Sequence, residues 1–326
     1  MINWTQEMIL NHLVFYGVGD KRTFDIYTGG DSGYVTRPLI RYGYIRKCDD
    51  GYYGITYKGR CCAEADEAII KPGSSKNSRE KAAKTGYVCA LFYMNGIFLS
   101  AEVWDWQKYF ILSRHWRKIR TSIISTTRFI GMLFYKGLKL AVYLIEDEKM
   151  EWQLYAEGSL FFRTYGSQET RADGMLMICP NNAPRIAEKI IRHTMWERRR
   201  LITNNFGYEN DKPVRYAKSP IRIKTDYQMV LLTDPEDLIS TLETIAGIRN
   251  IKLDYLKELG GQFEEFRTCE IVNGNDEYCI NPQNDLLKFV NLNIENLENP
   301  RLTHHVIMRE KYKNIAEMIG CDAVYV

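Results

Sequence analysis

The chain lacks paired cysteines, and this absence argues against a fold held together by disulfides. Eight cysteines occur in 326 residues, but only Cys61 and Cys62 are neighbours, and no C-x-x-C pair is present. Histidines and cysteines also lack the short spacing of zinc sites. His304 and His305 are adjacent, so one helix face cannot present both to a metal. We therefore predict free thiols in a reducing cytoplasm, no metal and no cofactor.

Long apolar runs are also missing. The longest, residues 86–99, includes Asn95 and falls short of the roughly 20 residues that a membrane-spanning helix needs. The N-terminus carries Glu7 early and has no small-residue cleavage site, which argues against a signal peptide. We therefore expect a cytoplasmic protein that has no membrane partner.

Several catalytic signatures are absent from the sequence. It has no G-x-x-x-x-G-K-[ST] phosphate loop, no G-x-S-x-G elbow and no H-E-x-x-H helix. The phosphate-loop absence argues against a nucleotide-hydrolysing motor. The five histidines are too scattered to suggest a proton-shuttling centre.

The chain also has no strong excess of either charge. Its net charge of +3 is too small to indicate a nucleic-acid partner, so the distribution of charge matters more. Residues 34–60 carry six Lys or Arg against two Asp, and residues 108–120 carry five Lys or Arg with no acid. These two stretches are the candidate basic surfaces, and an ordinary solvated face is the alternative for each.

Apolar residues, at 45% of the chain, are abundant enough for a substantial core, and the length predicts two or three domains. The stretch 71–78 is rich in polar residues and helix breakers, which is typical of a linker. We therefore predict a first domain over residues 1–70, a linker over 71–78 and a larger mixed α/β domain over 79–326. The fold class expected for the whole chain is α+β.

The first segment follows the pattern helix, helix, helix, hairpin, helix. Thr5 is expected to cap the first helix, Gly17 to end it and Asp20 to cap the second. Asp31 or Ser32 can cap a third helix.

The third helix contains a proline, and a hairpin follows it. Since Pro38 is costly in a helix interior, this helix either starts later, near Arg37, or is kinked. The pair Asp50-Gly51 then predicts a tight hairpin, and Thr56 can cap a fourth helix.

Two short motifs flank this hairpin. Gly43-Tyr44-Ile45 closes the third helix, and the run from Tyr53 to Gly59 reads Tyr-Gly-Ile-Thr-Tyr-Lys-Gly. Both resemble the GYI and Y-x-(L/I)-T-x-x-G motifs of small bacterial and phage winged helix-turn-helix DNA-binding domains. The resemblance implies that the third helix enters the major groove while the hairpin lies beside the flanking backbone. A winged helix used only for protein contact is the alternative.

The candidate DNA contacts are basic, aromatic and hydroxyl side chains. Arginine can bind guanine edges, and threonine or tyrosine can reach a phosphate or a thymine methyl group. The expected outward positions of the third helix are Tyr34, Thr36, Arg37 and Arg41. The hairpin and the fourth helix are expected to contact the DNA backbone through Arg46, Lys47, Tyr52, Lys58 and Arg60.

A second basic stretch, residues 114–120, interleaves cations with Trp116, a pattern that suits backbone binding with base stacking. An amphipathic basic helix on an ordinary surface explains the same pattern. The candidate contacts here are Arg114, Arg117, Lys118 and Arg120.

Beyond the linker, strand-like and helix-like stretches alternate, which predicts the mixed α/β domain. Strands are expected over 129–135, 138–145, 160–164, 175–179, 221–232 and 266–272. Helices are expected over 183–202, 235–245 and 309–319.

Asp173-Gly174, followed by an apolar strand, resembles the first half of the PD-(D/E)XK nuclease pattern. That pattern needs a second acid and a lysine on the next strand, where they help to bind a metal and activate its water. Residues 179–184 offer neither, and Asp147-Glu148-Lys149 lies in a charged, turn-like stretch upstream. We therefore expect a degenerate nuclease-like scaffold without catalysis. A metal-dependent nuclease that uses Asp173 is the alternative.

The complete layout resembles replication-relaxation proteins of plasmids and conjugative elements, and relaxosome accessory factors of the same kind. The resemblance implies a non-enzymatic protein that binds double-stranded DNA and assists a relaxase or a replication initiator at an origin. The second domain would then serve homodimer formation, partner contact or extra DNA contact. A transcriptional regulator with a ligand-sensing or dimerising second domain is the alternative.

Overall fold

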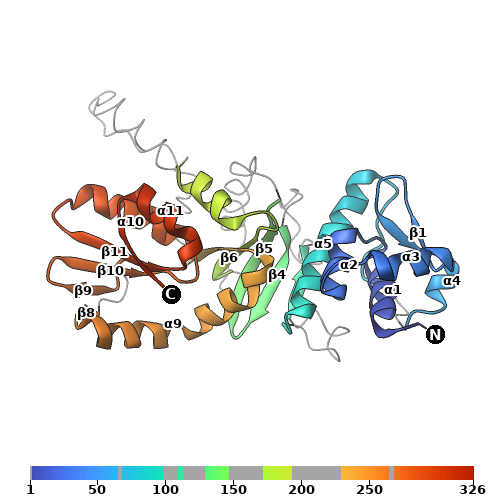
Figure 1. The fold of residues 1–326 in the computed structure, drawn as a ribbon, viewed down its shortest axis with the longest axis horizontal. Coiled ribbons are helices and arrows are strands. Elements are labelled where there is room, and N and C mark those ends of the chain that lie inside the picture. Colours follow the sequence, from blue (N-terminus) through green and yellow to red (C-terminus); the bar gives the residue numbers. More distant parts are fainter. Residues whose placement is uncertain are drawn as a thin grey trace, which may run out of the picture. The chain divides into compact units, whose positions relative to one another are not determined.

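The computed structural model describes residues 2–64, 68–97, 109–113, 129–146, 172–192, 229–263 and 268–326. The chain divides into two compact units, Met1–Gln107 and Lys108–Val326, and its fold class is α+β (Figure 1). None of the described helices is both long enough and apolar enough to cross a membrane.

The first unit has the predicted order of elements. Its helices and strands are α1 (Trp4–Tyr16), α2 (Lys21–Thr28), α3 (Gly33–Arg41), β1 (Ile45–Lys47), β2 (Tyr53–Ile55), α4 (Tyr57–Arg60) and α5 (Lys76–Met94). Strands β1 and β2 form the expected antiparallel hairpin. Gly19, between α1 and α2, adds a third short pairing, since its N–H and C=O bond Tyr53 at 3.1 and 2.8 Å.

Local signals set most helix ends in this unit. Gly17, with φ +75°, ends α1 as predicted, and the Asp20 carboxylate caps α2 by accepting the Thr23 N–H at 2.8 Å. The cap of α1 differs from the prediction. Asn3 rather than Thr5 caps this helix, because the side chains of Asn3 and Gln6 each bond the other's backbone N–H.

Helix α3 runs from Gly33 through Pro38 to Arg41, so it does not start near Arg37. Ser32 occupies its N-cap position without a side-chain bond, and the Asp31 carboxylate accepts the Gly33 N–H at 3.1 Å. Pro38 has no N–H, so the Tyr34 carbonyl loses its usual helical donor. Tyr34 is exposed, and water can replace that bond.

Helix α5 belongs to the first unit, which corrects the predicted domain boundary at residues 71–78. Its Ala90 joins the buried cluster of α1, α2 and α3, and Gly86 packs so closely on His12 that an added Cβ would lie 2.6 Å from the ring. Arg79 also pairs with Asp50 of the hairpin turn at 2.9 Å. The polar stretch is therefore a loop inside the unit, and the division falls after residue 107.

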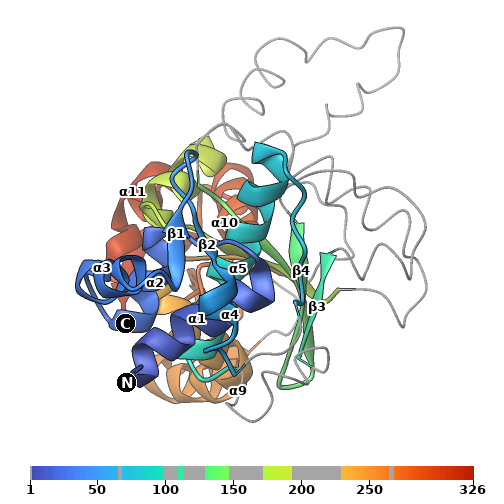
Figure 2. The same ribbon diagram turned by 90° about the vertical axis from the view of Figure 1, so that its right-hand side faces the viewer.

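The second unit contains two five-stranded sheets. The first sheet has the order β3 (Phe110–Leu112), β4 (Phe129–Tyr135), β5 (Leu138–Leu144), β6 (Gly174–Ile178), β7 (Met229–Thr233), and β3 and β4 lie side by side in Figure 2. The second has the order β8 (Gln262–Phe263), β9 (Ile271–Asn273), β10 (Asp276–Ile280), β11 (Thr303–Met308), β12 (Asp322–Tyr325).

Helices connect these strands. A helix begins at Ala183 and is described through residue 192. The others are η5 (Pro235–Asp237), α9 (Leu238–Leu259), α10 (Leu286–Glu298), η6 (Glu310–Tyr312) and α11 (Lys313–Ile319). Side chains from both sheets, from the helix at Ala183 and from α10, η6 and α11 share one buried cluster, so the unit has a common core.

The structure confirms several predicted elements to within one residue, namely the strands over 129–135, 138–145 and 175–179. Helix 235–245 is longer than predicted, since η5 and α9 reach Leu259. The stretches 221–232 and 266–272 are described in part, and there β7 and β9 are shorter or shifted. The strand predicted over 160–164 lies outside the described residues.

Candidate nucleic-acid interface

The outer face of α3 carries three of the predicted DNA contacts. Tyr34, Arg37 and Arg41 are all exposed, with 65% of Tyr34 accessible to solvent. Their spacing of three and four residues places them on one stripe of the helix, because an α-helix turns once in 3.6 residues. Val35 and Leu39 are buried on the inner side, as predicted. The helix therefore presents a basic and aromatic stripe away from its core.

Thr36 is not an outward position, which corrects the predicted contact set. Its side chain is only 4% exposed and lies with Val35 and Leu39 on the inner side of α3. Residue 36 is three positions from Leu39, so the helical turn carries both to the same side. Two side chains that sequence reasoning missed are exposed nearby: Ile40 and Tyr42.

The hairpin presents two further cations, Arg46 and Lys47, and both are exposed. Arg46 pairs in register with Gly54, and a Cβ built on Gly54 would lie 3.9 Å from Arg46 Nε. At that distance an added Cβ would make only ordinary van der Waals contact, so a small side chain at residue 54 would not displace the arginine. Among the described residues, no carboxylate forms a salt bridge with Arg37, Arg41, Arg46 or Lys47. Phosphate groups can therefore compete for these cations without breaking an ion pair to a described residue.

Tyr52 and Lys58 are engaged within the unit. Tyr52 is half-buried and packs on Val18, Ala82 and Ala83, and burial raises the pKa of its hydroxyl. Its ring therefore packs against α5 within the unit, where a contact to a DNA backbone was predicted. Lys58 donates to the Tyr42 carbonyl at 2.9 Å, with its ammonium 4.8 Å from the centre of the Tyr44 ring. Arg60 is exposed as expected.

The two sequence motifs meet at one junction. The Thr56 hydroxyl lies 2.9 Å from the Tyr44 carbonyl oxygen and 2.7 Å from that of Gly43, and it also accepts the Gly59 N–H at 3.1 Å. A Cβ at Gly59 would lie 2.0 Å from the Tyr44 oxygen, so any larger residue would push the end of α3 away. The T-x-x-G motif thus joins the end of α3 to the start of α4.

In the second unit, Asp173 has a structural partner. Its carboxylate accepts the Lys139 N–H at 2.7 Å, and its own N–H donates to the Lys139 carbonyl at 2.8 Å. The strand after β6 in the sheet, β7, reads Met-Val-Leu-Leu-Thr and supplies neither an acid nor a lysine. Asp173 therefore fastens β6 to β5. The stretch Asp147-Glu148-Lys149 lies outside the described residues.

The predicted second DNA site, with Arg114, Arg117, Lys118 and Arg120, also lies outside the described residues.

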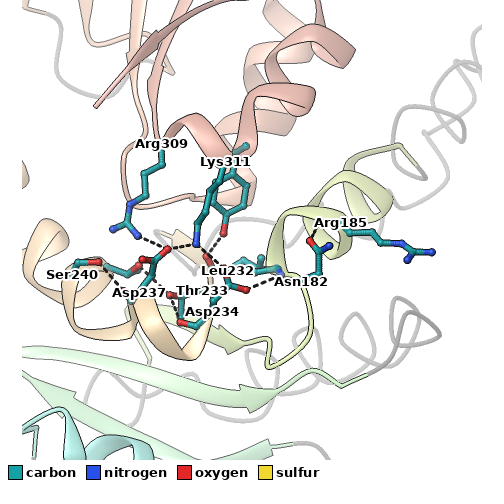
Figure 3. A network of polar contacts seen from close by, with 12 residues as sticks. Asn182, Arg185, Leu232, Thr233, Asp234, Asp237, Ser240, Arg309 and Lys311 are labelled. Atoms are coloured by element: carbon teal, nitrogen blue, oxygen red, sulfur yellow. Dashed lines mark hydrogen bonds and ion pairs between the residues drawn. The ribbon is translucent and has the colours of Figure 1, made fainter. Parts of the chain in front are cut away.

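The second unit contains an ion-pair network where its parallel strands end (Figure 3). Asp234, directly after β7, accepts the Ala183 N–H at 2.8 Å and the Lys311 ammonium at 2.6 Å.

Asp237 completes this network. It pairs with Lys311 and, at 3.1 Å, with Arg309, both of which follow β11 (Figure 3). Burial raises the pKa of Asp237, but the contacts with Lys311 and Arg309 outweigh it and leave that pKa lowered. Carboxyl ends of parallel strands often bind ligands. Here, Lys311 and Arg309 already pair with the carboxylates of Asp234 and Asp237. The network therefore links the end of β7 in the first sheet to the end of β11 in the second.

One cluster of possible metal ligands was not anticipated from the sequence. The ligand atoms of Cys269, Glu277, Glu295 and His304 lie within 4.8 Å of one another. Since β11 is a strand, His304 and His305 point to opposite faces, and His305 stacks on Tyr278 at 4.5 Å. The argument that adjacent histidines cannot share one helix face therefore does not apply to His304, because this residue lies in a strand.

Comparisons with protein-family models, with curated proteins and with solved structures found no match to this chain.

Proposed function

We propose that the first unit is a winged helix-turn-helix domain that binds double-stranded DNA with α3 in the major groove. The observation that supports this most is the exposed stripe of Tyr34, Arg37 and Arg41 on a helix whose opposite side is buried. The major groove is about 12 Å wide and admits an α-helix. Exposed Arg46 and Lys47 on the following hairpin supply a second basic element for the flanking phosphates.

The spacing of the two arginines supports a role in groove recognition. Arg37 and Arg41 are four residues apart, which separates them by about 6 Å along the helix axis. Base pairs stack at about 3.4 Å, so the two guanidinium groups would reach different base pairs or phosphates. Lys58, in α4, donates a hydrogen bond to the carbonyl of Tyr42, the residue that follows α3. This bond holds the C-terminal end of α3 in place.

For the whole chain we propose a non-enzymatic accessory protein of a plasmid or conjugative element, one that assists a relaxase or replication initiator at an origin. The second unit would act as a scaffold for a partner or a second copy. The bonding of Asp173 to the Lys139 backbone supports a non-catalytic role for that acid.

The test is fluorescence anisotropy with labelled duplexes from the gene's own surroundings and a scrambled duplex, measured over a salt series. We expect Arg37→Ala/Arg41→Ala to weaken binding to the preferred fragment by roughly 30-fold or more, because two base contacts of about 1–3 kcal/mol each are lost. Arg46→Ala/Lys47→Ala should weaken all duplexes equally and reduce the salt slope by about two.

The matched control removes two exposed cations from the second unit, Lys257→Ala/Lys313→Ala, and should bind like the wild type. Equal losses in the α3 variant and in this control would mean that net charge alone drives binding. Absence of binding to any duplex at low salt would overturn the DNA proposal and favour a protein-contact domain. A preferred fragment at a promoter, released by a small ligand, would favour a transcriptional regulator.

A further inference from the structure

Four ligand-type side chains converge in the second sheet from four separate elements. Cys269 precedes β9, Glu277 lies in β10, Glu295 in α10 and His304 in β11. Cys269, Glu277 and His304 are buried among the apolar residues of the core. Glu295 is half-buried, so one carboxylate, a thiol and an imidazole are buried beside a second carboxylate, all within 4.8 Å of one another. A cation bound among them would offset the cost of burying these groups.

The hydrogen bonds of Asn296 determine which nitrogen of His304 carries a proton. The Asn296 amide nitrogen donates to the carbonyls of Ile319 and Gly320 at 2.9 and 2.8 Å, which uses both of its protons. Its oxygen therefore faces His304 Nδ1, at 3.4 Å, and can only accept. Nδ1 is then the protonated nitrogen of the neutral ring, and Nε2 carries a lone pair.

That lone pair points into the cluster. His304 Nε2 is fully buried, makes no hydrogen bond in the described part of the chain and lies 3.4 Å from the Glu277 carboxylate. A lone pair facing a carboxylate oxygen is unfavourable unless a cation lies between them. An imidazole whose other nitrogen is held by an acceptor is the usual arrangement of a metal-binding histidine.

We propose that Cys269, Glu277, Glu295 and His304 bind a zinc ion. Zinc accepts thiolate, imidazole and carboxylate ligands together in a tetrahedral site, a set that magnesium and calcium do not prefer. Its ligand atoms would lie roughly 3.5 Å apart. His304 Nε2 and the Glu277 carboxylate already lie 3.4 Å apart, and the widest separation in the cluster, up to 4.8 Å, must shorten by about 1 Å. Four protein ligands leave no open position, so the ion is structural and fastens α10 to β10, β11 and the segment before β9.

The experiment measures metal content and metal binding in the purified full-length protein. We expect about one zinc per chain by mass spectrometry, or on titration after chelation. His304→Ala and Cys269→Ser should each reduce zinc affinity at least tenfold. Zinc should also raise the thermal melting temperature of the chelated wild type, and should fail to do so in these variants.

Cobalt substitution provides a measurement that needs no variant. Bound Co²⁺ should show tetrahedral visible bands and a thiolate charge-transfer band, because Cys269 would be a ligand. A cobalt complex without the thiolate band would overturn the four-ligand site. Absence of stoichiometric zinc after titration would also overturn it.

Matched controls separate this cluster from other thiols and imidazoles. His305→Ala changes the neighbouring histidine on the opposite face of β11, and Cys179→Ser changes a buried cysteine of the first sheet. Cys61→Ser/Cys62→Ser removes the exposed cysteine pair of the first unit. All three should retain zinc, and loss of the metal in the exposed-pair variant alone would assign it to that pair.

Discussion

The two sheets of the second unit have the same strand order and the same directions but different interiors. In each, the first three strands pair antiparallel and the last two pairs are parallel. The likeness extends to sequence. Residues 174–190 align without a gap with residues 303–319, and Ile186-Ala187-Glu188 corresponds to Ile315-Ala316-Glu317. The isoleucine and alanine of both triplets are buried, so the same helix face packs in each case.

This alignment makes Met175 equivalent to His304, and the strand registers extend the comparison. Met175 pairs with Ala141 in the first sheet, as His304 pairs with Glu277 in the second. All four residues are buried. One sheet thus fills these positions with apolar groups and the other with an acid and an imidazole. Equal topology therefore does not imply equal chemistry, and polar interior residues need a partner that apolar ones do not.

The largest expected effect comes from placing the second sheet's acid into the first. Ala141→Glu would bury a carboxylate beside Met132 and Met175, where the described structure offers no cation, so we expect a loss of more than about 4 kcal/mol in unfolding free energy. The measurement is urea unfolding. Ala246→Glu, the same change at an exposed alanine of α9, is the control and should cost less than about 1 kcal/mol.

The reverse change sharpens the comparison. Glu277→Ala, measured with chelator present, removes a buried acid and leaves a small cavity, so a loss of about 1–2 kcal/mol is expected. Equal costs for Ala141→Glu and Glu277→Ala would contradict the view that the second sheet is built to hold an acid at this position.

Asp285 lies where β7 of the first sheet meets α10, and its hydrogen bonds join these two elements. Its carboxylate oxygen accepts the N–H of Val230 in β7 at 2.9 Å and that of Leu287 in α10 at 3.0 Å. Burial raises the pKa of Asp285 to about 6, against the lowering effects of these bonds and of Lys288. The folded state therefore binds a proton more tightly than the unfolded state, whose pKa is near 3.8.

Stability should consequently fall as the pH rises from about 4 to about 6, and this group would contribute a loss of about 3 kcal/mol. Asp285→Asn keeps an oxygen that can accept both N–H groups, so it should flatten this part of the stability profile. Urea midpoints between pH 4 and pH 7 for both proteins provide the measurement. A wild-type profile that the substitution leaves unchanged would show that Asp285 does not titrate in this range.

Sequence reasoning succeeded where the signals are local. Gly17, Asp20 and Thr56 end or cap helices through bonds to residues within four positions, and the Asp50-Gly51 turn forms the hairpin that its two residues favour. Apolar runs such as 129–135 form strands because strand burial needs little beyond the run itself.

It failed where a distant part of the chain decides. Thr36 was expected outward, but α3 buries a wider strip of residues than its two aliphatic positions indicate. The polar stretch 71–78 looks like a linker, yet α5 beyond it packs on His12 through Gly86. Cys269 and His304 are 35 positions apart in sequence, and their cluster forms through tertiary structure, such as the pairing of β10 with β11 that places Glu277 beside His304.

The smallest effect is expected at the ion-pair network that joins the ends of β7 and β11. Lys311→Met would leave Asp234 with its Ala183 bond and Asp237 with Arg309. Because the lysine is about one-third exposed, solvent screening limits its contribution, and we expect a loss of about 1 kcal/mol. A double-mutant cycle with Asp237→Asn, measured by urea unfolding at low and high salt, isolates the pair. A coupling energy that is near zero at low salt would mean that this ion pair does not help to hold the two sheets together. A coupling energy that falls as the salt concentration rises would show that this ion-pair network contributes to holding the two sheets together.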